Sequence, residues 1–145
     1  MARSVHTFSI PSSTRYLEDV RRFVETHALE ADLPEDSVEK FKIAVDEACT
    51  NVIEHAYGGD EHHRVDLAII VEADQFTVRI RDNGVPFDTS NYQEPNLLEL
   101  TKHRRGGGLG VHIMRRLMDH VEYRTRGSTN EVLLTMYRNA NGNEG

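Results

Sequence analysis

The chain has 145 residues, which fits one domain and is enough to bury a hydrophobic core. Apolar residues make up 38% and charged residues 28%, which excludes a disordered chain, and no apolar run approaches the roughly 20 residues of a membrane span. The net charge of -7 disfavours nonspecific binding to nucleic acid, although it leaves an acidic nucleotide possible as a ligand. The single cysteine excludes an internal disulfide and, with no apolar signal segment, favours a cytoplasmic location.

The first part of the chain predicts one strand and two helices. Residues 4–10 alternate in polarity, as in an edge strand, and apolar residues recur at helical spacing from Pro11 to about Leu29. A second, longer helix is expected over about 35–57, with Pro34 at its start. Its apolar stripe consists of Phe41, Val45, Ala48 and Val52.

The second part of the chain predicts four strands and one helix. The expected elements are strands at 65–71 and 76–82, a loop at 85–107, a helix at about 109–118, and strands at 120–126 and 130–138. A loop of this length inside a compact domain is usually functional. The order predicts a single α+β domain over 1–145: a two-layer sandwich whose mostly antiparallel sheet carries helices on one face. Residues 139–145 are expected to be a disordered tail.

Polar side chains form a ridge along the long helix. Glu47, Asn51 and His55 are each four residues apart, and the first two lie about 110° from the centre of the apolar stripe at about 100° per residue. That position is the rim of the buried face. A carboxylate and a carboxamide there suit Mg²⁺ or a polarised water, but an ordinary solvated helix face explains the same pattern.

The strand at 76–82 ends in a carboxylate that points inward. Asp82 continues the parity of Phe76, Val78 and Ile80, so its side chain is expected on the core side. Burying it is costly unless it accepts hydrogen bonds, and an amino group on a ligand could donate one. The following Asn83-Gly84 pair is equally a hairpin signal.

Four glycines fall within residues 106–110, in the stretch RRGGGLGVHIMRR. Backbone amides at the start of a helix form an anion site, and glycines let a phosphate approach closely. The spacing matches neither of the common glycine-rich phosphate motifs. Taken alone, a flexible linker or a hinge explains these glycines as well.

The three motifs together resemble the GHKL nucleotide-binding superfamily. Within it, EACTNVIEHAY, RDNGVPFD and GGGLGVHIMRRLMD are similar to the bacterial anti-sigma factor serine kinases of the RsbW-like family. The resemblance covers nearly the whole chain, and it implies the GHKL (Bergerat) type of sandwich.

The resemblance also assigns roles. It implies that Glu47 is the general base, that Asn51 holds the Mg²⁺ of bound ATP, and that Asp82 accepts the adenine amino group with Gly84 allowing close packing of the base. Residues 89–105 would form the ATP lid. The implied phosphate-binding residues are Gly106, Gly107, Gly108, Leu109 and Gly110.

Two features depart from the family pattern or stay open. Many relatives have a Gly-Thr pair near the adenine, and here the stretch reads Ser128-Thr129-Asn130-Glu131, so that contact has no assigned residue. Thr135 is a candidate for a nearby polar contact or simply a strand threonine. Arg104 and Arg105 either place positive charge near the γ-phosphate or form a solvated pair.

The implied function is an ATP- and Mg²⁺-dependent serine-protein kinase that acts as an anti-sigma factor. Its expected partners are a STAS-type anti-anti-sigma protein, which it phosphorylates, and a sigma factor, which it sequesters; a homodimer is also implied. A nucleotide-binding regulatory module without efficient phosphoryl transfer is the alternative. The catalytic half of a sensor histidine kinase is disfavoured, because no phosphoacceptor helical hairpin fits before residue 35.

Overall fold

The computed structural model describes residues 3–85 and 107–138. Within them lie the strands β1 (Ser4–Pro11), β2 (Arg64–Val71), β3 (Gln75–Asp82), β4 (His120–Arg126) and β5 (Thr129–Tyr137). The α-helices are α1 (Leu17–Glu30), α2 (Glu35–Asn51) and α4 (Gly107–Leu117), with a short 3-10 helix, η1 (Thr14–Tyr16), before α1 and a π-helical segment, η2 (Val52–Ala56), after α2.

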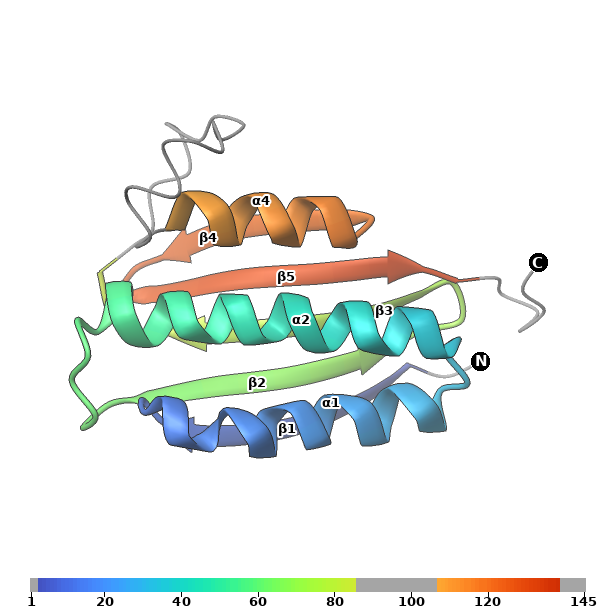
Figure 1. Cartoon of the computed structure of the whole chain (residues 1–145), viewed down its shortest axis with the longest axis horizontal. Helices are drawn as coiled ribbons and strands as arrows, with labels where there is room; N and C mark the ends of the chain where they lie inside the picture. Colours follow the sequence, from blue (N-terminus) through green and yellow to red (C-terminus); the bar gives the residue numbers. More distant parts are fainter. Residues whose placement is uncertain (1–2, 86–106, 139–145) are drawn as a thin grey trace.

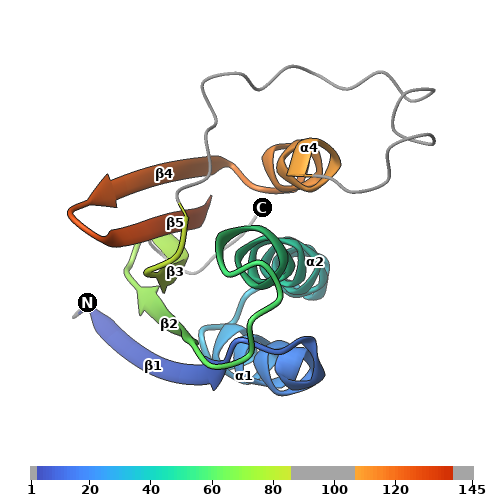
Figure 2. The same cartoon turned by 90° about the vertical axis from the view of Figure 1, so that its left-hand side faces the viewer.

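The strands form one sheet in the order β1-β2-β3-β5-β4, and every neighbouring pair is antiparallel. Figures 1 and 2 show α1, α2 and α4 side by side on one face of this sheet. The predicted α+β sandwich is therefore confirmed, with β1 at an edge as expected. No described helix is long and apolar enough to cross a membrane.

Helix α2 takes its position from its apolar stripe. Phe41, Val45, Ala48 and Val52 are each at most 8% exposed and face the sheet. Glu35 and Asp36 occupy the first turn, where the helix dipole favours negative charge. The predicted helix over 35–57 is present, but residues 52–56 wind as a π-helix, which no sequence pattern indicated.

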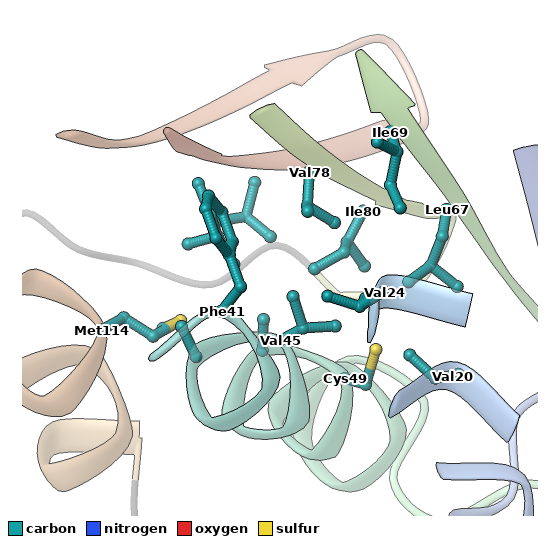
Figure 3. Close-up of a cluster of buried hydrophobic side chains, with 14 of the residues drawn as sticks. Val20, Val24, Phe41, Val45, Cys49, Leu67, Ile69, Val78, Ile80 and Met114 are labelled. Atoms are coloured by element: carbon teal, nitrogen blue, oxygen red, sulfur yellow. The ribbon is translucent and has the colours of Figure 1, made fainter. Parts of the chain in front are cut away.

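Side chains from all three helices meet the inner face of the sheet in one core (Figure 3). Phe41 is fully buried, and its ring packs edge-on against Phe76 with the ring centroids 5.1 Å apart. Cys49 lies in the same core, and burial raises the pKa of its thiol to about 12, so it remains a protonated, apolar side chain. The labelled members are Val20, Val24, Phe41, Val45, Cys49, Leu67, Ile69, Val78, Ile80 and Met114.

Replacing Phe41 tests whether this core holds the two layers together. We expect Phe41→Ala to lower the free energy of unfolding by about 3–5 kcal/mol, because it leaves a cavity between helix and sheet. Ile43 is 50% exposed on the same helix, and Ile43→Ala should change the free energy by no more than about 0.5 kcal/mol. Urea denaturation measures both, and equal losses for the two variants would contradict the packing described.

Candidate functional site

A cavity of about 200 Å³ opens where α2 and η2 end beside the sheet. Figure 1 shows the C-terminal ends of α2, β3 and β4 together with the starts of β5 and α4 at this same end of the molecule. The polar residues that line the cavity include Asn51, Asp82, Thr125 and Asn130. The apolar residues include Ala48, Val52, Ala56, Val85 and Val132. Pockets for whole drug-sized ligands begin at roughly 300 Å³, so this cavity suits a single ring system.

Asp82 lines this cavity and is buried on the helix-facing side of β3, as its parity predicted. Its side chain is buried, and its Oδ1 accepts hydrogen bonds from the Gly84 amide at 2.8 Å and from the Asn130 Nδ2 at 2.9 Å. Its Oδ2 has no hydrogen-bond partner among the described residues. The carboxylate is thus held by one oxygen, and the other is available to a donor in the cavity.

Gly84 is required by a contact that the sequence did not indicate. A Cβ atom there would lie 2.3 Å from the carbonyl oxygen of Ala56, and the next amide, of Val85, donates to that same oxygen at 2.9 Å. The turn after β3 therefore packs on the backbone of η2, and this contact accounts for the glycine without a ligand. The hairpin alternative for Asn83-Gly84 is wrong, because β3 pairs with β2 and β5.

The hydroxyl of Tyr57 links the same turn to the start of β2. It donates to the carbonyl oxygen of Arg64 at 2.8 Å and accepts from the amide of Asn83 at 2.9 Å. The Tyr57 ring stacks on His63 with their centroids 4.5 Å apart. Burial raises the pKa of Tyr57, so the hydroxyl keeps the proton that it donates.

The polar ridge of α2 runs outward from the cavity. Asn51 lines the cavity, whereas Glu47, one turn earlier, lines a shallow groove between α1 and α2. Desolvation raises the pKa of Glu47, with smaller contributions from the negative charges of Asp46 and Glu54. A carboxylate with a raised pKa is a stronger base, which suits proton transfer near neutral pH.

His55 also lines the cavity, and its side chain is exposed. The side chain of His55 makes no hydrogen bond with the residues that the structure describes.

The glycine-rich stretch lies partly inside α4. Gly107, Gly108, Leu109 and Gly110 form the first turn of this helix, which begins two residues before the predicted start at 109. The first amides of a helix have no partners within it and are available to an anion. Gly106, Arg104, Arg105 and the predicted lid at 89–105 lie outside the described residues.

Thr135 does not belong to this site. Its hydroxyl lies 3.1 Å from that of Thr77, its partner across β3 and β5, on the face of the sheet away from the helices. Asn130, five residues earlier on β5, faces the cavity instead. It shares the inward parity of Val132 and Leu134, so the argument that identified Asp82 could have identified Asn130 as well.

The described residues offer little by themselves to a metal ion. No group of three or more His, Cys, Asp or Glu side chains in this part of the chain could hold one. Asn51 and Asp82 are among the oxygen-bearing side chains that line the cavity. This donor set fits Mg²⁺ that arrives with a nucleotide, because such an ion takes most of its ligands from phosphates and water.

Known proteins that resemble this chain are ATPase domains and protein kinases. Residues 10–136 match the family model of the histidine kinase-like ATPase domain. The serine-protein kinase RsbW of Listeria monocytogenes is 31% identical over 138 residues, which cover 92% of this chain and 87% of that protein.

Two solved structures share the fold. One contains the RsbU and RsbW domains of Rv1364c from Mycobacterium tuberculosis, with a TM-score of 0.64, 12% identity, and coverage of 92% of this chain and 31% of that one. The SiaB–SiaC complex from Pseudomonas aeruginosa gives a TM-score of 0.64 at 16% identity, covering 90% of this chain and 88% of the matched chain.

The close approach of Gly84 to Ala56 predicts that any side chain at position 84 lowers the stability of the folded chain. We expect Gly84→Ala to lower the free energy of unfolding by about 1–3 kcal/mol, because the new methyl group overlaps backbone that cannot move aside freely. Thermal or urea unfolding measures this loss, and a variant as stable as the parent chain would contradict the contact.

The raised pKa of Glu47 predicts a dependence of stability on pH. Between the unfolded pKa, near 4.5, and the higher folded one, the folded chain binds more protons, so stability falls as pH rises through this window. We expect Glu47→Gln to remove this fall, and its melting temperature relative to the parent chain should increase from about pH 4 to about pH 7. A difference that is constant with pH would contradict the shift.

Proposed function

The chain belongs to the histidine kinase-like ATPase family and, within it, to the RsbW-like GHKL kinases, and on this premise we propose that it is an ATP-dependent serine-protein kinase acting as an anti-sigma factor. It phosphorylates a serine on a STAS-type anti-anti-sigma protein. It sequesters a sigma factor when that partner is phosphorylated. We place this partner switching in the cytoplasm.

One observation supports this proposal above the others: a buried carboxylate and a carboxamide line one cavity, and the polar ridge of α2 continues from that carboxamide. Asp82 has one oxygen without a partner among the described residues, Asn51 lines the same cavity, and Glu47 lies one turn before Asn51 on α2. In the proposed binding mode, a base at Asp82 extends its phosphates past Asn51 toward Glu47. Phosphoryl transfer depends mostly on such positioning and on neutralising charge.

The remaining roles follow from the chemistry of each group. Asn51 holds the Mg²⁺ that accompanies ATP, and this ion supplies neutralisation of the phosphate charge when bound. Amides from residues 106–110 bind the phosphates. Glu47 accepts the proton of the attacking serine hydroxyl, a step favoured by its raised pKa.

A homodimer is part of the same proposal. Its candidate surface is β1, an edge strand of the sheet, together with the neighbouring α1.

The regulatory module without efficient phosphoryl transfer remains the second candidate, and one observation favours it. Glu47 does not line the cavity among the described residues but lies in the groove beside it. Under this candidate, nucleotide binding alone sets the affinity for the partner, and Glu47 is a partly solvated helix residue.

Transfer of label from [γ-³²P]ATP to the cognate STAS-type protein separates the two candidates. We expect Glu47→Gln to slow this transfer by about 10²- to 10⁴-fold, because the variant keeps the shape of the side chain and loses the base. Its affinity for ADP should be unchanged, since Glu47 lies outside the cavity.

The control is Asp82→Asn, which should weaken ADP binding itself. Transfer by Glu47→Gln at the rate of the parent chain would refute the kinase mechanism. Nucleotide-dependent partner binding without any transfer by the parent chain would favour the regulatory module.

A further inference from the structure

Asn130 uses every hydrogen-bonding group of its side chain inside the cavity. Its Nδ2 donates to the Oδ1 of Asp82 and to the carbonyl oxygen of Gly84, both at 2.9 Å, and its Oδ1 accepts from the hydroxyl of Thr125 at 3.2 Å. A carbonyl oxygen can only accept, so the NH₂ group must point this way. With Asn130 only 9% exposed, the amide has one arrangement that satisfies all three partners.

This arrangement limits what Asp82 can do. Its Oδ1 is occupied by two donors, the amide of Gly84 and the Nδ2 of Asn130. Rotation of the carboxylate would break both hydrogen bonds. Asp82 therefore presents a single oxygen, Oδ2, to the cavity in one fixed direction.

We propose that Asn130 is a positioning residue that sets the base selectivity of the site, by fixing Asp82 as an acceptor for the exocyclic amino group of a 6-aminopurine. The inference rests on the proposed nucleotide site and adds to it how the base is discriminated. The residue acts through Asp82, on the strand where the family's usual threonine contact could not be assigned.

The discrimination follows from the donors and acceptors of the two purine types. A 6-aminopurine has a donor at position 6 and an acceptor at N1, whereas a 6-oxopurine has an acceptor at position 6 and a donor at N1. A fixed Oδ2 opposite position 6 pairs with the amino group and repels the oxo group. A carboxylate free to rotate could turn toward the N1 donor, so loss of Asn130 should relax the selectivity.

A purely structural role for Asn130 makes a different prediction. It would change the stability of the chain and weaken every nucleotide by the same factor, because it would deform the cavity as a whole. The ratio of the dissociation constants for IDP and ADP would then stay constant. This ratio is therefore the informative measurement.

Calorimetric titration of the full chain with ADP and with IDP, each with Mg²⁺, tests the proposal. The parent chain should bind ADP more tightly than IDP, and Asn130→Ala should reduce the ratio of their dissociation constants by about tenfold, as expected for a lost hydrogen bond to a charged group. Thr125→Ala removes only the donor that holds the Asn130 Oδ1 and should reduce the ratio less. This second variant tests the proposal if Asn130→Ala does not fold.

Thr77→Val is the matched control, because it removes a buried hydroxyl hydrogen bond from β3 on the opposite face of the sheet. It should leave the ratio unchanged. An unchanged ratio in the Asn130 and Thr125 variants, or a parent chain that binds ADP and IDP equally, would overturn the inference while the nucleotide site stands. A parent chain that binds neither nucleotide would overturn the proposed function and this inference together.

Discussion

The turn that follows β3 packs directly on η2, the π-helical segment that continues α2, and the geometry of the candidate site depends on that contact. Gly84 has no room for a side chain beside Ala56, whose carbonyl oxygen also accepts from the amide of Val85. Tyr57 ties the same turn to the start of β2. Because the end of the sheet and the end of α2 are joined in this way, the carboxylate on one and the carboxamide on the other face a common cavity.

That geometry places polar groups where burial is costly, and the structure satisfies most of their hydrogen-bonding capacity. Asp82 is buried, but two donors bind one of its oxygens, and Asn130 supplies one of them while satisfying its own amide. Two groups lower the stability of the folded chain. One is the Oδ2 of Asp82, which has no partner among the described residues, and the other is the desolvated carboxyl of Glu47. Groups held in this way are typical of sites that bind or transfer charge.

Much of this arrangement could be predicted from sequence, because it follows periodicity. The stripe that begins at Phe41 predicted which side of α2 meets the sheet, and strand parity predicted that Asp82 points inward. Parity would equally have identified Asn130, but the pairing of β5 with β3 involves distant segments and no pattern fixes their register. The contact that explains Gly84 was not predictable either, since it requires the π-helical turn over residues 52–56. Thr135 has the opposite parity to Val132, so the alternation in β5 places it on the outer face of the sheet, away from the cavity.

The proposed function requires that a purine nucleotide binds in the cavity between α2, the end of β3 and the start of β5. Titration of the ¹⁵N-labelled chain with Mg²⁺ and ADP, followed by NMR, tests it most directly. We expect the largest chemical-shift changes at the backbone amide of Gly84 and the side-chain amides of Asn51 and Asn130. Changes confined to the α1–α2 groove or to the outer face of the sheet, or none at saturating ADP, would contradict it.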